Sequence, residues 1–159
     1  MLFRSMRQGL AAYRAMGSEL ARSHFLSFLV EGYAKAGQIE EGFAILAEAF
    51  DMVEGNNDRV VEAKLYQLKG ELLLQARNQS PETTMKEAEQ CFQQAIKVAR
   101  RQEAKSWELG AATSLARLWK KQGKVKEARQ LLSEIYSWFT EGFDTKALQE
   151  AKTLLDALS

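Results

Sequence analysis

The sequence holds a single proline, a single cysteine and a single histidine among 159 residues. Proline breaks the interior of helices and strands, so its scarcity beside abundant alanine, leucine, glutamate and lysine indicates helix nearly throughout. The lone Cys91 excludes an internal disulfide and fits a reducing compartment. His24 has no second histidine or cysteine near it in the sequence, so the chain offers no metal-binding set.

Long apolar runs are also missing. No stretch approaches the roughly 20 apolar residues that span a bilayer, and the opening MLFRSMRQ lacks the apolar stretch of a secretory signal. The chain contains no GxxxxGK followed by Ser or Thr, no GxGxxG and no HExxH. We therefore expect a cytoplasmic, non-enzymatic chain with no cofactor, no metal, no catalytic residue and no membrane partner.

The net charge is only +1, but it is unevenly distributed. Residues 30–63 hold eight acidic and two basic residues, a balance of −6. Residues 93–129 hold ten basic and three acidic residues, a balance of +7. This polarity favours weak head-to-tail self-association, and it leaves the later surface suited to an anionic partner.

Glycines and small polar residues divide the chain into helix-sized segments. Gly37, Gly123 and Gly142 are typical of helix ends, and Ser80-Pro81 is typical of an N-cap followed by proline in the first turn. The breaks predict eight helices, over residues 2–16, 18–36, 38–54, 58–76, 81–101, 104–122, 124–141 and 144–158.

Large and small apolar residues repeat along the chain. One set is Leu26, Leu29, Tyr33, Gly37, Gly42, Leu46 and Ala49, and a second is Ala112, Leu115, Trp119, Gly123, Ala128, Leu132 and Ile135. The intervals are 3, 4, 4, 5, 4 and 3 in both. A third set fits with about six extra residues around Pro81: Tyr66, Gly70, Leu73, Ala88, Phe92 and Ala95. We interpret the small members, with Gly70, as sites of close helix approach, and Cys91 as a packing residue beside Phe92.

This pattern resembles the tetratricopeptide repeat (TPR), a helix–turn–helix unit. The resemblance implies an all-α, TPR-like helical-hairpin solenoid of about eight antiparallel helices in a single domain, 1–159. Residues 1–16 would be the second helix of a truncated repeat, 18–54, 58–101 and 104–141 the three repeats, and 144–158 a capping helix. The opening in mid-repeat suggests a piece of a longer protein.

The segment SWFTEGFDTKAL, residues 137–148, has two interpretations. Phe139 continues the apolar stripe of the helix before it, and Asp144 is placed to cap the next helix, with Phe143 and Leu148 as a hydrophobic staple. The segment would then join the last repeat to its lid. The alternative is an exposed aromatic hook for a partner, carried by Trp138.

A second resemblance covers residues 87–155. The strings AKSWELGAATSLARL and WFTEGFDT are similar to the C-terminal TPR region of bacterial proteins that combine a class III adenylate or guanylate cyclase with an AAA-type or signal-transduction ATPase. This implies a protein-interaction or regulatory module for signal transduction, with the catalytic domains outside the chain. The alternative is the ligand-sensing TPR arm of an ATPase-type transcriptional activator.

In TPR proteins the first helix of each pair lines a concave groove, and its exposed positions recur at i, i+3, i+7 and i+10 or i+11. Applied here, the spacing predicts a partner groove formed by His24, Ser27, Glu31, Lys35, Lys64, Gln67, Glu71, Gln75, Thr113, Arg117, Lys120 and Lys121. We expect this groove to be polar throughout and basic at its C-terminal end.

The later repeats carry a dense basic run. A nucleic-acid backbone would suit such a surface, but aromatics for base stacking are not evident, since Trp119 and Phe92 fall on core positions. The remaining interpretations are a solvated helix face or a surface for an acidic protein. The expected partner is thus a protein or extended peptide, acidic in part, or another domain of the same polypeptide.

Overall fold

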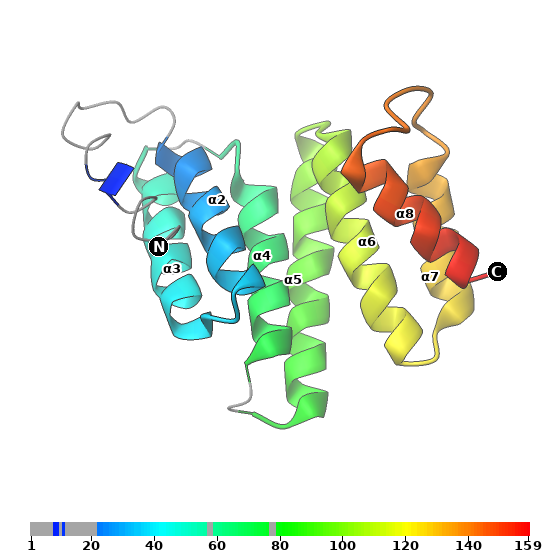
Figure 1. Cartoon of the computed structure of the whole chain (residues 1–159), viewed down its shortest axis with the longest axis horizontal. Coiled ribbons are helices and arrows are strands. Elements are labelled where there is room, and N and C mark those ends of the chain that lie inside the picture. The colour runs from blue at the N-terminus through cyan, green and yellow to red at the C-terminus, as the bar shows by residue number, and fades with distance from the viewer. Residues whose placement is uncertain (1–7, 10, 12–21, 57–58, 77–78) are drawn as a thin grey trace.

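The structure is a computed structural model that describes residues 8, 9, 11, 22–56, 59–76 and 79–159 (Figure 1). Seven helices have described bounds: α2 Arg22–Lys35, α3 Ile39–Asn56, α4 Glu62–Gln75, α5 Pro81–Arg101, α6 Lys105–Lys121, α7 Val125–Tyr136 and α8 Lys146–Ala157. Within the described ranges there is no strand, so the prediction of an all-α chain is confirmed. The predicted helix 2–16 lies outside the described residues apart from residues 8, 9 and 11. No helix in the described ranges is both long enough and apolar enough to cross a bilayer.

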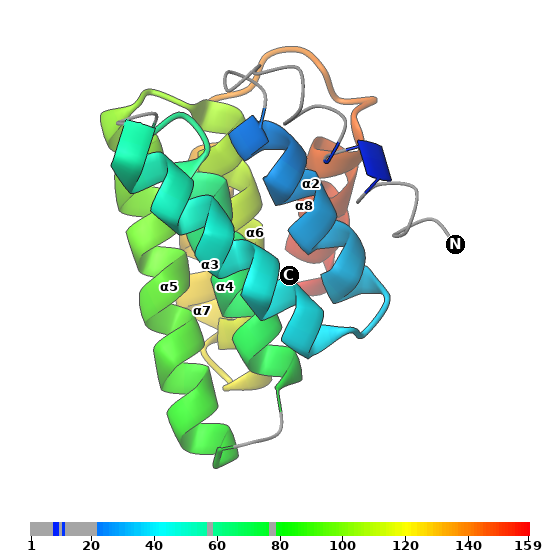
Figure 2. The same ribbon diagram turned by 90° about the vertical axis from the view of Figure 1, so that its left-hand side faces the viewer.

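Figure 1 shows α2 and α3 at one end of the molecule, α4, α5 and α6 in the middle, and α7 and α8 at the other end. Figure 2 views the molecule from the α2–α3 end. Each described helix packs on the next along the chain. The even-numbered helices α2, α4, α6 and α8 also contact one another in succession. The odd-numbered helices α3, α5 and α7, in the described part of the chain, contact only even-numbered ones.

The repeating apolar positions form the core. The buried members are Leu26, Leu29, Tyr33, Gly42, Leu46, Ala49, Gly70, Ala88, Phe92, Ala95, Ala112, Leu115, Ala128, Leu132 and Ile135. Two large clusters result, one around α2, α3 and α4 and one around α5 to α8. Helix α4 joins them, because Leu65, Leu68 and Leu72 belong to the first cluster whereas Tyr66 and Leu73 pack against the second.

Three helix ends share one hydrogen-bond pattern. After α2, Gln38 N donates to Tyr33 O (3.0 Å) and Gly37 N to Ala34 O (3.1 Å), with Gly37 at φ 74°. This is the Schellman arrangement, which needs a left-handed residue. The turns after α5 and α6 repeat it, with Glu103 at φ 55° and Gly123 at φ 81° in the equivalent place. Among the described residues, Glu103 is the one residue other than glycine that has a positive φ.

The start of α5 matches its prediction. The Ser80 side chain accepts a hydrogen bond from Thr83 N at 3.3 Å, and Pro81 occupies the first turn, where its missing N–H costs nothing. The start of α4 differs from the predicted residue 58. A turn, in which Glu62 N donates to Arg59 O, comes first, and α4 begins at Glu62.

The end of α7 also differs, since it stops at Tyr136 rather than at residue 141. Trp138 N donates to Ile135 O and Phe139 N to Tyr136 O. These hydrogen bonds join residues three positions apart instead of four, so the backbone leaves the α-helical path after Tyr136. The prediction that Asp144 caps α8 is wrong, because the N-cap is Thr145. The Thr145 hydroxyl donates to Gly142 O (2.7 Å) instead of accepting from the helix.

With Thr145 as the N-cap, Phe143 and Leu148 no longer occupy the N′ and N4 positions of a hydrophobic staple. The Phe143 ring lies 5.7 Å from the ring of Tyr136. Leu148 is nevertheless buried, as are Ala151 and Leu154, so α8 covers α6 and α7 with its apolar side.

Candidate binding groove

A groove opens along the even-numbered helices. Side chains from α2, α4, α6 and α8 line a cavity with a volume of about 560 Å³. Eight of the twelve residues predicted for a partner groove line it: Glu31, Lys35, Lys64, Gln67, Glu71, Gln75, Thr113 and Arg117. Most of the residues predicted from the repeat spacing therefore lie together in the structure.

The other four predicted residues lie elsewhere. The His24 ring is 6.4 Å from the ring of Trp107, and the hydroxyl of the buried Ser27 donates to the His24 carbonyl oxygen at 2.7 Å. Lys120 lines a shallower depression beside α8, and Lys121 lines one between α4, α5 and α6. The lysines thus border the groove without lining it.

Sequence reasoning missed several groove residues. Ser106, Trp107 and Gly110 enter from the first turns of α6, and Lys146, Ala147 and Glu150 enter from α8. The first group lies one to two turns before Thr113, the first residue predicted on this helix. The second was missed because residues 144–158 were interpreted only as a capping helix.

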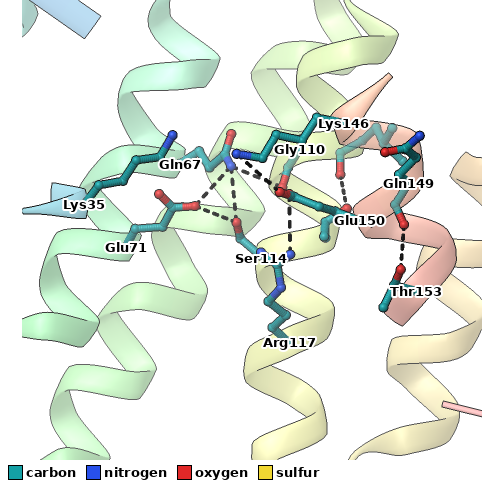
Figure 3. Close-up of polar contacts among 12 residues, drawn as sticks. Lys35, Gln67, Glu71, Gly110, Ser114, Arg117, Lys146, Gln149, Glu150 and Thr153 are labelled. Carbon is teal, nitrogen blue, oxygen red and sulfur yellow. Dashed lines mark hydrogen bonds and ion pairs between the residues drawn. The ribbon is translucent and has the colours of Figure 1, made fainter. Parts of the chain in front are cut away.

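The groove floor is a hydrogen-bonded network between α4 and α6 (Figure 3). The Gln67 side-chain Nε2 lies 3.2 Å from each of three acceptors, Glu71 Oε1, the Gly110 carbonyl oxygen and Ser114 Oγ. Ser114 Oγ donates to Glu71 Oε1 at 2.9 Å. Gln67 and Ser114 are both buried, and their hydrogen bonds hold the Glu71 carboxylate in place.

Gly110 permits this floor. A Cβ on Gly110 would lie 3.1 Å from Gln67 Oε1, closer than most real side-chain contacts. The absent side chain lets the Gln67 amide approach the α6 backbone closely enough to donate to the Gly110 carbonyl oxygen.

Two sets of charges flank the floor. We call Glu31, Lys35 and Lys64 the N-terminal triad, and Arg117, Lys146 and Glu150 the C-terminal triad. In the N-terminal triad the Glu31 carboxylate is 3.3 Å from Lys35 Nζ and 3.7 Å from Lys64 Nζ. In the C-terminal triad the Glu150 carboxylate is 3.6 Å from Arg117 Nη2 and 3.8 Å from Lys146 Nζ. The expected basic end of the groove is therefore mixed, with two cations around one carboxylate.

A second polar cluster lies where the α5–α6 turn meets the α7–α8 loop. Glu108 is only 2% exposed, and its carboxylate accepts from Arg100 Nε at 2.9 Å and from Lys105 Nζ at 3.1 Å. Lys105 Nζ also lies 5.6 Å from the centre of the Trp138 ring, which suits a cation–π contact.

Both interpretations of the 137–148 segment therefore have a structural counterpart. Phe139 packs against the core cluster of α5 to α8. Trp138 is 58% exposed, and its ring packs edge-on against the Phe139 ring, with ring centres 5.2 Å apart.

Two partly buried titratable groups lie outside the groove. Burial raises the pKa of the Cys91 thiol, partly opposed by the positive charge of Lys69. Burial also raises the pKa of Tyr66, and the Glu62 carboxylate adds to the effect. Among the described residues no group of three His, Cys, Asp or Glu side chains is placed to hold a metal ion. The groove itself offers hydrogen-bonding groups and charged side chains.

Compared with known proteins, the chain matches no protein-family model and no curated protein.

Proposed function

We propose that this chain is a non-catalytic, TPR-like interaction module whose groove holds an extended segment of a partner protein. The TPR-like part is supported by the repeated spacing of buried residues, by the recurrent Schellman turns and by the succession of even-numbered helices. A solenoid built in this way presents one helix of each pair on a continuous inner surface.

The observation that carries the proposal is the groove along α2, α4, α6 and α8. It crosses four helices, so it suits a ligand that is long in one direction. Pockets for compact small molecules are mostly apolar with few polar groups. Here seven charged side chains, the two triads and Glu71, line the walls and floor. An extended peptide, whose backbone and side chains both form hydrogen bonds, fits that lining better.

The resemblance of residues 87–155 to cyclase–ATPase proteins supports a host of that kind, a bacterial nucleotide-cyclase signalling protein. The bound segment would then come from another domain of the same polypeptide or from a protein that regulates it. The module would transmit occupancy of its groove to catalytic domains that lie outside this chain.

Selection of peptides from a random display library against the whole chain tests the proposal. Ala147 and Ala44 are both exposed on helices, but only Ala147 lines the groove. Ala147→Trp fills the groove, so it should abolish binding of the selected peptides, and Ala44→Trp on α3 should not. Peptides that bind both variants equally would show that recognition lies elsewhere, with the Trp138 surface next in order.

A further inference from the structure

Six of the groove's seven charged side chains occur as two matched sets, one toward each end of the groove. The N-terminal triad spans α2 and α4. The C-terminal triad spans α6 and α8 (Figure 3). Each contains two cations and a single carboxylate, so each retains one positive charge. The uncompensated charge is thus divided between the two ends of the groove.

Contacts within the triads are loose. Their four N–O distances run from 3.3 to 3.8 Å, longer than the roughly 2.7–2.9 Å of a strong charge-assisted hydrogen bond. Elsewhere in this chain Lys152 and Asp156 approach to 2.7 Å. The triad cations therefore keep hydrogen-bonding capacity that a ligand anion with better geometry would use.

The floor between the triads has the opposite character. Glu71 is anionic, and its Oε1 already accepts from Gln67 and Ser114. A second carboxylate placed there would be repelled. A ligand that fits the groove is therefore anionic at both ends and neutral in the middle.

Helix spacing sets the separation of the two anionic groups. The centres of the triads are two helix spacings apart, which at about 8–10 Å each is about 16–20 Å. An extended chain advances about 3.3 Å per residue, so two side chains about five or six residues apart reach both triads.

We infer that the groove recognises a segment carrying two anionic side chains five or six residues apart, one at each triad, and that Glu31 and Glu150 act as internal competitors that the ligand displaces. This inference rests on the proposed function and adds the chemistry of the bound segment. Removing a competing carboxylate strengthens binding, and removing a triad cation weakens it.

The probes are capped peptides of about twelve residues, built from glycine and serine with two glutamates five or six positions apart. Matched peptides carry glutamates two apart, one glutamate, or glutamine in place of both. Binding is measured by calorimetry or NMR titration at about 0.1 M ionic strength, where distant charges are screened. The widely spaced pair should bind about tenfold more tightly than any matched peptide.

Protein variants separate a specific site from a general charge effect. Glu150→Gln and Glu31→Gln should each tighten binding of the widely spaced pair about threefold or more, and Arg117→Met should weaken it about tenfold. The controls carry the same charge changes on exposed surfaces outside the groove, with Glu127→Gln on α7 and Lys86→Met on α5. They should change affinity less than about twofold.

The two proposals fail in different ways. If the library peptides bind in a manner sensitive to Ala147→Trp but glutamate and glutamine probes bind alike, or neither binds, the two-anion inference is overturned and the groove remains a peptide site. Equal tightening by Glu150→Gln and Glu127→Gln overturns the role of the competing carboxylates. If the groove block affects no peptide, the proposed function itself is wrong.

Discussion

Phe92 lies against Gly70 so closely that a Cβ on the glycine would stand 2.5 Å from the ring's Cε1 atom. The ring is completely buried on α5, and Gly70 is in the middle of α4. Gly70 is a poor helix former, but its missing side chain leaves the space that the Phe92 ring fills. Phe92 is the largest fully buried side chain in the described core.

Gly70→Ala should therefore lower the free energy of unfolding by about 1–3 kcal/mol through overpacking, although helix propensity alone predicts a gain of about 1 kcal/mol. Urea denaturation measures the difference. Gly55→Ala is the matched control, because nothing lies within 4 Å of a Cβ there, and it should be neutral or stabilising. A stabilised Gly70→Ala would show that the ring has room to move.

Glu103 occupies the left-handed position that glycine fills after α2 and α6. Glu103→Gly should raise the free energy of unfolding by about 0.5–1 kcal/mol, because the relieved strain of about 1–2 kcal/mol exceeds the entropy cost of a glycine in the unfolded chain. Thermal unfolding measures the gain. Gly123→Ala should change stability in the opposite direction, and a destabilised Glu103→Gly would mean that its backbone carries no strain.

The Cys91 thiol should react slowly with alkylating reagents in the folded chain. Its raised pKa, caused by burial, lowers the thiolate fraction at a given pH. Because the unfolded chain loses this proton first as pH rises, the group's contribution to stability is present below its ordinary pKa and declines above it. Iodoacetamide labelling from pH 7 to 10 should rise later than for the urea-unfolded chain, and superimposable profiles would contradict the prediction.

Helix α8 should be required for the stability of α6 and α7. Ala151 is fully buried and Ala157 is exposed on the same helix. Ala151→Arg should cost about 2–4 kcal/mol, whereas Ala157→Arg should stay within about 0.5 kcal/mol. Deleting residues 143–159 should expose the same surface and promote self-association in sedimentation runs. A truncated chain that melts unchanged and stays monodisperse would show that no lid is needed.

Local signals account for what could be read from the sequence. Gly37, Gly123 and the Ser80-Pro81 pair act within a few residues of themselves, so they marked helix ends correctly. Phe92 and Ala88 recur at a helical period, so they marked the core. The end of α7 was not predicted correctly because the backbone changes from α-helix to tighter turns at Trp138 and Phe139. Glycine positions and capping patterns do not indicate such a change.

The groove was predictable in outline and not in detail. Spacing on α2 and α4 located residues such as Glu31 and Glu71. The hydrogen bond from Gln67 to Ser114 joins residues 47 positions apart, and the sequence around neither residue predicts this contact. The same holds for Arg117 and Glu150, whose pairing depends on how α8 lies across α6.

The position of α4 between the two core clusters has a consequence for how the molecule opens. The backbones of α2 and α3 lie close to that of α4 and to none of the helices that follow it. Apart from α4, the side chain of Trp107 on α6 also packs against the core cluster of α2, α3 and α4. Stability in such arrays is distributed unit by unit. The backbone amides of α2 and α3 should therefore exchange with deuterium as a group before those of α5 and α6. Since α2 carries one wall of the groove, a bound ligand would slow exchange first in the helix pair that opens most readily.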